Sequence, residues 1–218
     1  MVGAAPWLTV EELTRVAFER SAVVMLNEAR AGARYCPRTR RVGVAMVRAA
    51  HALGVRRLAV ESITDDELPR AAKDLGWSVH PYEIVADWDR MTREEAGSTE
   101  FGQRRELAQA QNLAAVADGG HRVLVWCGNG HGGKDRTDDW SPMGWHFPRV
   151  SGVATFSIDQ TLTVDWPDRG EARPGLAREL SGVLAPFGGT AAILREDMTE
   201  DPGAFYDAYV VSTDNAFT

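Results

Sequence analysis

Short runs dominated by apolar residues recur along the first part of the chain. Those at 22–26, 57–60 and 122–126 are too short for helices and show no alternation, which is typical of strands buried on both faces of a parallel sheet. A less regular strand is expected at 79–85. Before and between these strands the apolar residues recur at helical spacing, and the helices predicted in this way span 10–20, 42–53, 66–75 and 92–118.

Capping residues and glycines mark several of the predicted helix ends. Thr9 is followed three residues later by Glu12, which is the pattern of a capping box and places the first helix start just after Thr9. Gly54 stands where the second helix is expected to stop. The long segment at 92–118 is weakened by Gly97 and Gly102 and becomes strongly helical only beyond them.

Strands separated by helices define the expected fold class. The C-terminal third adds an alternating segment, a helix and two strands, which are expected at 153–164, 173–184, 191–194 and 206–212. We predict an α/β fold with a mostly parallel central sheet flanked by helices. No repeat or linker divides the 218 residues, so a single domain over 1–218 is expected. Ligands of such folds bind at the carboxyl edge of the strands, and the active site is expected there.

The charge balance narrows the classes of partner. Lys and Arg number 24 against 31 Asp and Glu, so the formal net charge is −7. Such a surface repels phosphate backbones and anionic lipid, which argues against nucleic-acid binding. No apolar run approaches the roughly 20 residues of a membrane-spanning helix, and the N-terminus lacks the pattern of a signal peptide. We expect a cytoplasmic protein without nucleic-acid or membrane partners.

The sequence predicts neither a metal site nor a cofactor. Cys36 and Cys127 are too few and too far apart for a disulfide framework or a thiolate zinc site, and are expected to be free thiols. Aspartates 135, 138 and 139 could help bind a hard cation, but loop aspartates are more often simply solvated. Four histidines show no paired metal spacing and are set aside, namely His51, His80, His121 and His146.

Candidate acid/base residues stand at three of the predicted strand ends. Glu28 follows the first strand, Glu61 follows the second, and His131 lies in a glycine-rich loop after the strand at 122–126. Parallel strands bring these ends to one edge, where burial raises the pKa of a carboxyl group and an imidazole suits proton transfer near neutral pH. A purely structural ion-pair network is the alternative interpretation.

Basic residues are expected to pair with the glutamates or to bind substrate. Arg30 and Arg40 follow the first strand closely, and Arg104 and Arg105 begin the strong part of the long helix. Guanidinium groups suit both glutamate pairing and the binding of an anionic substrate group. Lys134 is counted with these four arginines as a substrate-binding candidate.

The segment 128–134 matches part of a phosphate-binding loop. Its sequence GNGHGGK follows a predicted strand and ends at Lys134. The next residue is Asp135, which replaces the hydroxyl residue that would hold magnesium and adds negative charge near the phosphates. Nucleotide hydrolysis is therefore disfavoured. Covalent catalysis by serine or by Cys127 is a minority option, because no nucleophile elbow and no cationic helix terminus can be identified.

The order of these motifs resembles the erythromycin-esterase-like superfamily, which also takes in ChaN-type haem-binding and Tiki-type proteins. The resemblance covers roughly 20–160 and is carried by Asn27-Glu28-Ala29-Arg30, by Leu58-Ala59-Val60-Glu61 and by Gly128-Asn129-Gly130-His131. It implies that Glu28, Glu61 and His131 form the active-site set. It also implies that Arg40 and one of Arg104 or Arg105 correspond to arginines of the family.

One position departs from the family pattern. Arg30 or Ala31, according to the spacing, stands where the family has its first histidine, and Asn27 replaces the preceding glycine. An arginine can neither act as a base at neutral pH nor ligate a metal. We therefore expect a metal-independent site in which His131 or Glu61 is the base.

These observations lead to an expected function. The sequence predicts an acid/base enzyme that hydrolyses an ester, lactone or amide, or carries out a related step, on a small natural product or a modified peptide. Arg30 and Arg40 are expected to bind an anionic group or a developing oxyanion. A non-catalytic ligand-binding or haem-binding member of the same superfamily is the alternative, and a homodimer stays open.

Overall fold

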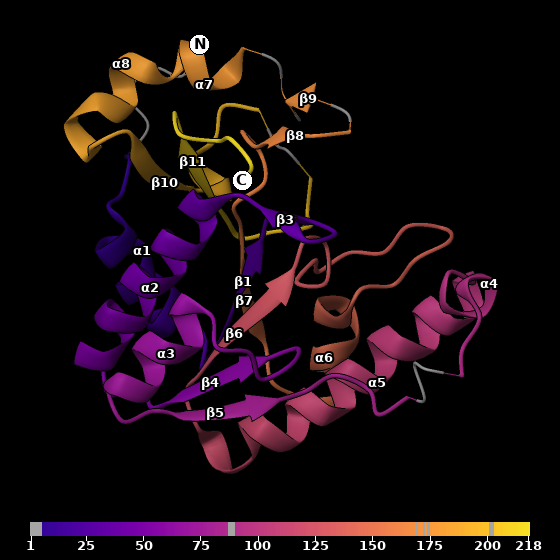
Figure 1. The fold of residues 1–218 in the computed structure, drawn as a ribbon. Helices are drawn as coiled ribbons and strands as arrows, with labels where there is room; N and C mark the ends of the chain where they lie inside the picture. Colours follow the sequence, from indigo (N-terminus) through magenta and orange to yellow (C-terminus); the bar gives the residue numbers. More distant parts are fainter. Residues whose placement is uncertain (1–5, 87–89, 169, 172, 174, 201–202) are drawn as a thin grey trace.

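A computed structural model describes residues 6–86, 90–168, 170–171, 173, 175–200 and 203–218. Its centre is a seven-stranded sheet in the order β10-β11-β7-β1-β6-β4-β5, in which β10 runs antiparallel to β11 and the other pairings are parallel (Figure 1). The strands are β1 (Val23–Glu28), β4 (Arg57–Val60), β5 (Ser78–Pro81), β6 (Val123–Gly128), β7 (Thr155–Asp159), β10 (Thr190–Leu194) and β11 (Ala208–Ser212).

Helices cover both faces of this sheet. On one face lie α1 (Val10–Arg20), α2 (Pro37–Ala52) and α3 (Glu67–Asp74), and on the other lie α5 (Thr99–Ala117) and α6 (Met143–Ser151) (Figure 1). Each face has its own apolar core, with Met46 and Leu58 in the first and Leu113 and Phe147 in the second. The predicted α/β fold with a mostly parallel sheet is confirmed.

Smaller elements gather around the sheet. Two hairpins are formed by β2 (Arg30–Ala31) with β3 (Arg34–Tyr35), and by β8 (Asp165–Trp166) with β9 (Gly170–Glu171). The remaining helices are α4 (Arg93–Ala96), α7 (Leu176–Glu179), α8 (Ser181–Leu184) and the 3-10 turns Asp118–Gly120, Ala185–Phe187 and Arg195–Asp197.

Strand β1 is central to the sheet and carries residues of the expected site. All six of its residues are buried, and it pairs with β6 on one side and β7 on the other. The strand extends past the predicted apolar run to include Asn27 and Glu28. These polar residues stay in register because β6 continues beside them to Gly128.

The start of the first helix confirms the capping prediction. The Thr9 hydroxyl accepts a hydrogen bond from the Glu12 amide, and the Glu12 carboxylate accepts one from the Thr9 amide. This reciprocal pair satisfies two N–H groups that a helix start leaves without partners.

Several predicted boundaries are wrong for identifiable reasons. The single helix at 92–118 is broken near Gly97, which caps α4, whereas Gly102 lies within α5. The helix at 173–184 is two short helices, α7 and α8. The strand at 79–85 ends at Pro81, although the amides of Tyr82 and Glu83 still donate to the carbonyls of the β4 side at 2.9 and 3.1 Å.

Two regions for which the sequence predicts neither a helix nor a strand contain regular structure. The segment 29–37 forms the β2–β3 hairpin, whose turn includes Gly32 at a φ of 61°. The last part of the glycine-rich loop begins α6, which contains Pro148 and ends at Gly152 in a left-handed conformation. Proline inside the helical pattern and glycine around it hide this helix from a sequence reading.

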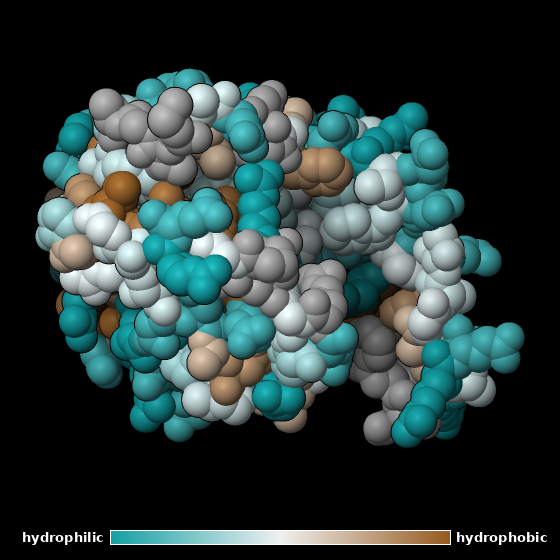
Figure 2. All heavy atoms as spheres, turned by 90° about the horizontal axis from the view of Figure 1, so that it is seen from above, coloured by the Kyte–Doolittle hydropathy of each residue, from teal (hydrophilic) through white to brown (hydrophobic). Residues whose placement is uncertain are grey.

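The surface seen from above, over the top of Figure 1, is mainly polar. In Figure 2 hydrophilic side chains cover most of this face, and hydrophobic ones gather in small separate areas. Within the described ranges, no helix has the length and apolar character needed to cross a bilayer.

Candidate functional site

A histidine and a glutamate form the centre of the site. His131 lies in the loop after β6, and Glu106 projects from α5. His131 Nδ1 is 2.5 Å from Glu106 Oε1, an ion-pair contact whose alignment departs from that of an N–H···O hydrogen bond. The other oxygen of Glu106 accepts a 2.6 Å hydrogen bond from the Met143 amide at the start of α6. These two contacts fix the Glu106 side chain, which holds the Nδ1 edge of the imidazole toward α5.

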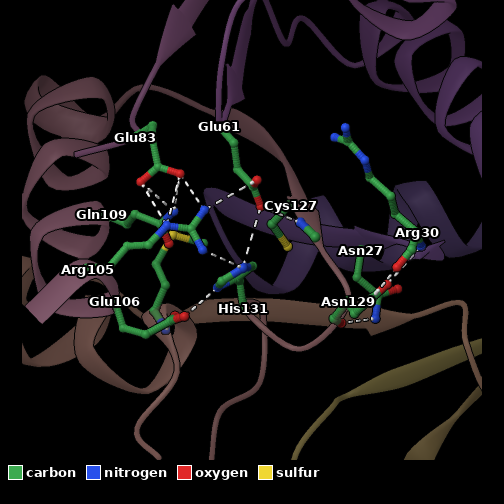
Figure 3. A network of polar contacts seen from close by, with 12 residues as sticks. Asn27, Arg30, Glu61, Glu83, Arg105, Glu106, Gln109, Cys127, Asn129 and His131 are labelled. Atoms are coloured by element: carbon green, nitrogen blue, oxygen red, sulfur yellow. Dashed lines mark hydrogen bonds and ion pairs between the residues drawn. The ribbon is translucent and has the colours of Figure 1, made fainter. Parts of the chain in front are cut away.

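Glu61 faces the opposite nitrogen of the imidazole. It follows β4, and its Oε1 accepts a 2.7 Å hydrogen bond from the Gly128 amide at the end of β6. His131 Nε2 lies 3.7 Å from the same oxygen, and Arg105 Nη2 lies 3.6 Å from Oε2. Neighbouring strand ends and α5 therefore converge on one carboxylate, as Figure 3 shows.

Arg105 is held in place by residues of α5 and of the segment after β5. Its guanidinium is ion-paired with both oxygens of Glu83, and Gln109 donates to the same carboxylate at 3.1 Å. Arg105 Nη1 lies 3.4 Å from His131 Nε2. The arginine thus has one acidic partner that fixes it and another, Glu61, at longer range.

The surroundings of His131 favour its charged form. Burial lowers the pKa of this histidine, but the contact with Glu106 and the negative charges of Glu106 and Glu61 outweigh burial, so the pKa lies above the ordinary value of 6.5. The imidazolium then stands between two carboxylates. A protonated histidine in this position is equipped to give up a proton.

The expected partner of Glu28 is also in place. Arg40 Nε lies 2.5 Å from Glu28 Oε1, its Nη1 is 3.1 Å from Asp66, and its guanidinium stacks 3.6 Å above the centre of the Tyr35 ring. Burial raises the pKa of Glu28 and the Arg40 hydrogen bond lowers it, with a net rise. Arg40 is occupied by these acidic partners.

Glu28 and Glu61 line the same hollow. A recess of about 50 Å³ lies at the ends of β1, β6 and β4, beside the segment before α3. Ser62 and Thr64 supply hydroxyl groups to its wall, and Arg30 lies at its lining as well. Both predicted glutamates, Glu28 and Glu61, and the predicted Arg30 therefore line one recess.

Two of the predicted substrate-binding residues point elsewhere. The guanidinium of Arg104 lies 5.2 Å from the centre of the Phe101 ring, and its side chain is exposed on α5. Lys134 Nζ lies 2.8 Å from Asp207 and donates to the Thr155 carbonyl. Of the two neighbouring arginines of α5, only Arg105 enters the cluster around His131.

Cys127 does not have the properties of a nucleophile. The side chain is buried, and its sulfur donates to the Leu26 carbonyl at 3.6 Å. Burial raises the pKa of the thiol well above its ordinary value, so the neutral form dominates. The minority option of cysteine catalysis loses its physical basis.

The glycines of the loop after β6 serve close packing. A Cβ atom at Gly130 would lie 2.6 Å from the Trp140 ring, and one at Gly132 would lie 3.3 Å from Cys127 Sγ. A Cβ atom at Gly128 would lie 2.9 Å from Glu61 Oε1. Side chains already fill the space that a Cβ atom would need at Gly130 and Gly132.

The sequence reading missed three residues of the cluster: Glu83, Glu106 and Gln109. Glu83 comes just after β5, as Glu61 comes just after β4. A glutamate after each of two successive strands was therefore a signal in the sequence that Glu83 belongs to the site. Glu106 and Gln109 lie three residues apart and both are buried on α5. Buried polar residues at helical spacing mark the face that meets the site.

The clustered carboxylates do not form a metal-binding set. Within the described part of the chain, no group of three or more His, Cys, Asp and Glu side chains is placed to hold a metal ion. Glu61, Glu83 and Glu106 instead each contact Arg105 or His131.

Comparison with known proteins identifies the fold. No family model matches the chain, and no curated protein matches it in sequence. Among solved structures, the type III effector HopBA1 gives a TM-score of 0.51 at 13% identity, with 94% of each chain covered. A protein from Bacillus cereus gives a TM-score of 0.53 at 12% identity, covering 95% of this chain and 94% of its own. Identities this low show a shared fold, and activity has to be argued from the site.

Proposed function

We propose that the protein is an acid/base hydrolase that cleaves an ester, lactone or amide, or carries out a related step, on a small natural product or modified peptide. The observation that carries the proposal is the Glu61 carboxylate, which lines a recess and contacts a histidine of raised pKa. A base and an acid of opposite charge are adjacent there, which is what hydrolysis at neutral pH needs.

Each step of the proposed reaction transfers one proton, and the last transfer restores the starting protonation state. Glu61 takes a proton from water as the water oxygen bonds to the substrate carbonyl carbon. The bond to the leaving group then breaks, and the leaving oxygen or nitrogen receives the proton of the His131 imidazolium. The proton on Glu61 passes to His131, whose Nε2 is 3.7 Å away, and this transfer restores the starting state. Glu106 stabilises the imidazolium before and after the transfer.

The motif resemblance supports the same reaction class. Glu28 ends β1, Glu61 follows β4 and His131 lies in the loop after β6. The resemblance implies that these three residues form the active-site set. We therefore propose a divergent member of that superfamily in which Arg30 occupies the region of the first histidine. Cytoplasmic location stays a prediction, and a homodimer stays open.

A binding protein without chemistry is the second candidate. It is favoured by the number of contacts that already engage Glu61, namely Gly128, His131 and Arg105. A carboxylate engaged in this way would hold the recess in shape without reacting. Ligand binding that survives loss of the acid and the base, with no product formed, would identify this case.

The test is turnover of a panel of 4-nitrophenyl esters, lactones and 4-nitroanilides by the wild type and by Glu61→Gln and His131→Ala. We expect each variant to lose at least about a hundredfold in turnover, the usual contribution of a general base or acid. Glu100→Gln, an exposed residue in the first turn of α5, is the matched control and should be unchanged. Wild-type turnover in both site variants would refute the proposal, and a wild type inert toward the whole panel would favour the binding protein.

A further inference from the structure

The arginines of the site differ in how completely they are neutralised. Arg40 is ion-paired with Glu28 and Asp66, and Arg105 is ion-paired with two other glutamates. Arg30 lines the same recess, yet its Nε donates only to the Gly32 carbonyl at 3.0 Å. Among the residues that the structure describes, no carboxylate lies within ion-pair distance of Arg30. One guanidinium at the recess therefore keeps its charge available.

The backbone of Arg30 is fixed although its side chain is exposed. Its amide donates to Asn129 Oδ1 at 2.9 Å, and its carbonyl accepts from Asn129 Nδ2 at 2.8 Å. The Asn129 carbonyl in turn accepts from Asn27 Nδ2 at 2.7 Å. In Figure 3 the Arg30 side chain extends away from these hydrogen bonds to Asn129, and it is separate from the His131 cluster. These hydrogen bonds fix the backbone from which the side chain starts and do not involve the guanidinium.

We propose that Arg30 binds an anionic group of the substrate, a carboxylate or a phosphate, at the mouth of the recess. The inference rests on the proposed hydrolysis and names its substrate class. A guanidinium donates two parallel hydrogen bonds to either oxyanion, which a lysine cannot do. The substrate is thus an anionic ester, lactone or amide rather than a neutral one.

The charges at the recess also orient such a substrate. Glu28 and Glu61 lie in the recess lining and repel an anion, whereas Arg30 attracts it. The neutral carbonyl end therefore enters toward Glu61 while the anionic end stays at Arg30. Of the arginines and the lysine that the sequence singles out, only Arg30 combines access to the recess with an unpaired charge.

The test measures binding by calorimetry and does not depend on turnover. The probes are phenylacetate, phenyl phosphate and the neutral phenylacetamide, each titrated into the wild type, Arg30→Gln and Arg104→Gln. Arg104→Gln removes the same charge from an exposed arginine that lies over Phe101, and serves as the matched control. Because the readout is binding and not product formation, an inactive enzyme leaves the result readable.

We expect at least one anion to bind the wild type about tenfold more tightly than the amide, as a charge-assisted hydrogen bond allows. Arg30→Gln should remove this preference and leave amide binding within about twofold, while Arg104→Gln should keep it. The stronger of the two anions then identifies carboxylate or phosphate as the natural group. Equal binding of all three probes, an unchanged preference in Arg30→Gln, or an equal loss in Arg104→Gln would overturn the inference.

Discussion

At the scale of single residues, the protonation of His131 depends on Glu106. The Glu106 carboxylate lies 2.5 Å from Nδ1 and is itself buried, so its charge acts on the imidazole with little screening by water. We expect Glu106→Gln to lower the pKa of His131, because the variant lacks the negative charge beside Nδ1. Titration of the imidazole carbon by NMR measures this directly. An unchanged His131 titration in the variant would contradict the role given to Glu106.

The same pair makes stability depend on pH. Because the folded-state pKa of His131 is raised above 6.5, its contribution to the free energy of unfolding is complete below that pH. The contribution is lost as pH rises through the folded-state value. Urea unfolding of the wild type and Glu106→Gln at a series of pH values should show their difference narrowing above pH 6.5. A difference in the free energy of unfolding that stays constant or widens above pH 6.5 would contradict the stabilising contact between Glu106 and His131.

The sequence reading found the residues that stand at strand ends and missed those that meet them. Glu28 ends a buried strand, and Glu61 and His131 follow buried strands. The geometry of parallel sheets brings such positions together. Glu106 reaches His131 from α5, and this contact depends on how a helix is rotated against the sheet. Local patterns do not determine that rotation to the single residue, which is why Arg104 and Arg105 could not be distinguished.

At the scale of elements, the end of β6 approaches the site closely. A Cβ atom at Gly128 would lie 2.9 Å from Glu61 Oε1 and 3.2 Å from the His131 ring. We expect Gly128→Ala to push the flexible Glu61 side chain aside, which lowers turnover about tenfold to a hundredfold while changing stability by under about 1 kcal/mol. Ester turnover and urea unfolding of the same variant separate the two effects.

Gly102→Ala is the matched control for this substitution. Gly102 lies within α5, and a Cβ atom there meets nothing within 4 Å. Alanine should stabilise the helix by about 0.5–1 kcal/mol and leave turnover unchanged. Full activity in Gly128→Ala, or a loss in both variants, would refute the close approach at Gly128.

The predicted elements were most accurate where periodicity and capping agree. The helix that starts after Thr9 begins as its capping box requires, and β4 spans the predicted residues. The helix α6 was missed because Pro148 and neighbouring glycines imitate a loop. Its place is set by packing, since Phe147 lies in the core formed with α5. Tertiary contacts therefore decided what local propensity could not.

At the scale of the whole molecule, the sheet order predicts a gradient of local stability. Strand β1 is buried throughout and lies between β6 and β7, whereas β5 is at the edge and is exposed at both ends. Amides of β1 should exchange with solvent at least about a hundredfold more slowly than those of β5. Native-state hydrogen exchange by NMR measures both. Equal protection of the two strands would contradict this sheet order.

The fold class followed from the sequence because alternating buried strands and amphipathic helices have few arrangements that bury both apolar faces. The order of the strands did not follow, since β6 inserts between β1 and β4 although it comes after both in the chain. That insertion brings Gly128 beside Glu61 and creates the site. The proposed function therefore depends on a feature of topology that periodicity does not reveal.

The most direct test of the acid and base roles is the pH dependence of ester hydrolysis by the wild type and Glu106→Gln. We expect a bell-shaped profile, in which activity rises as carboxyl groups lose protons and falls above pH 6.5 as His131 loses its own. In Glu106→Gln the alkaline limb should move to lower pH while the acid limb stays. An alkaline limb that does not move would contradict the assignment of His131 as the proton donor.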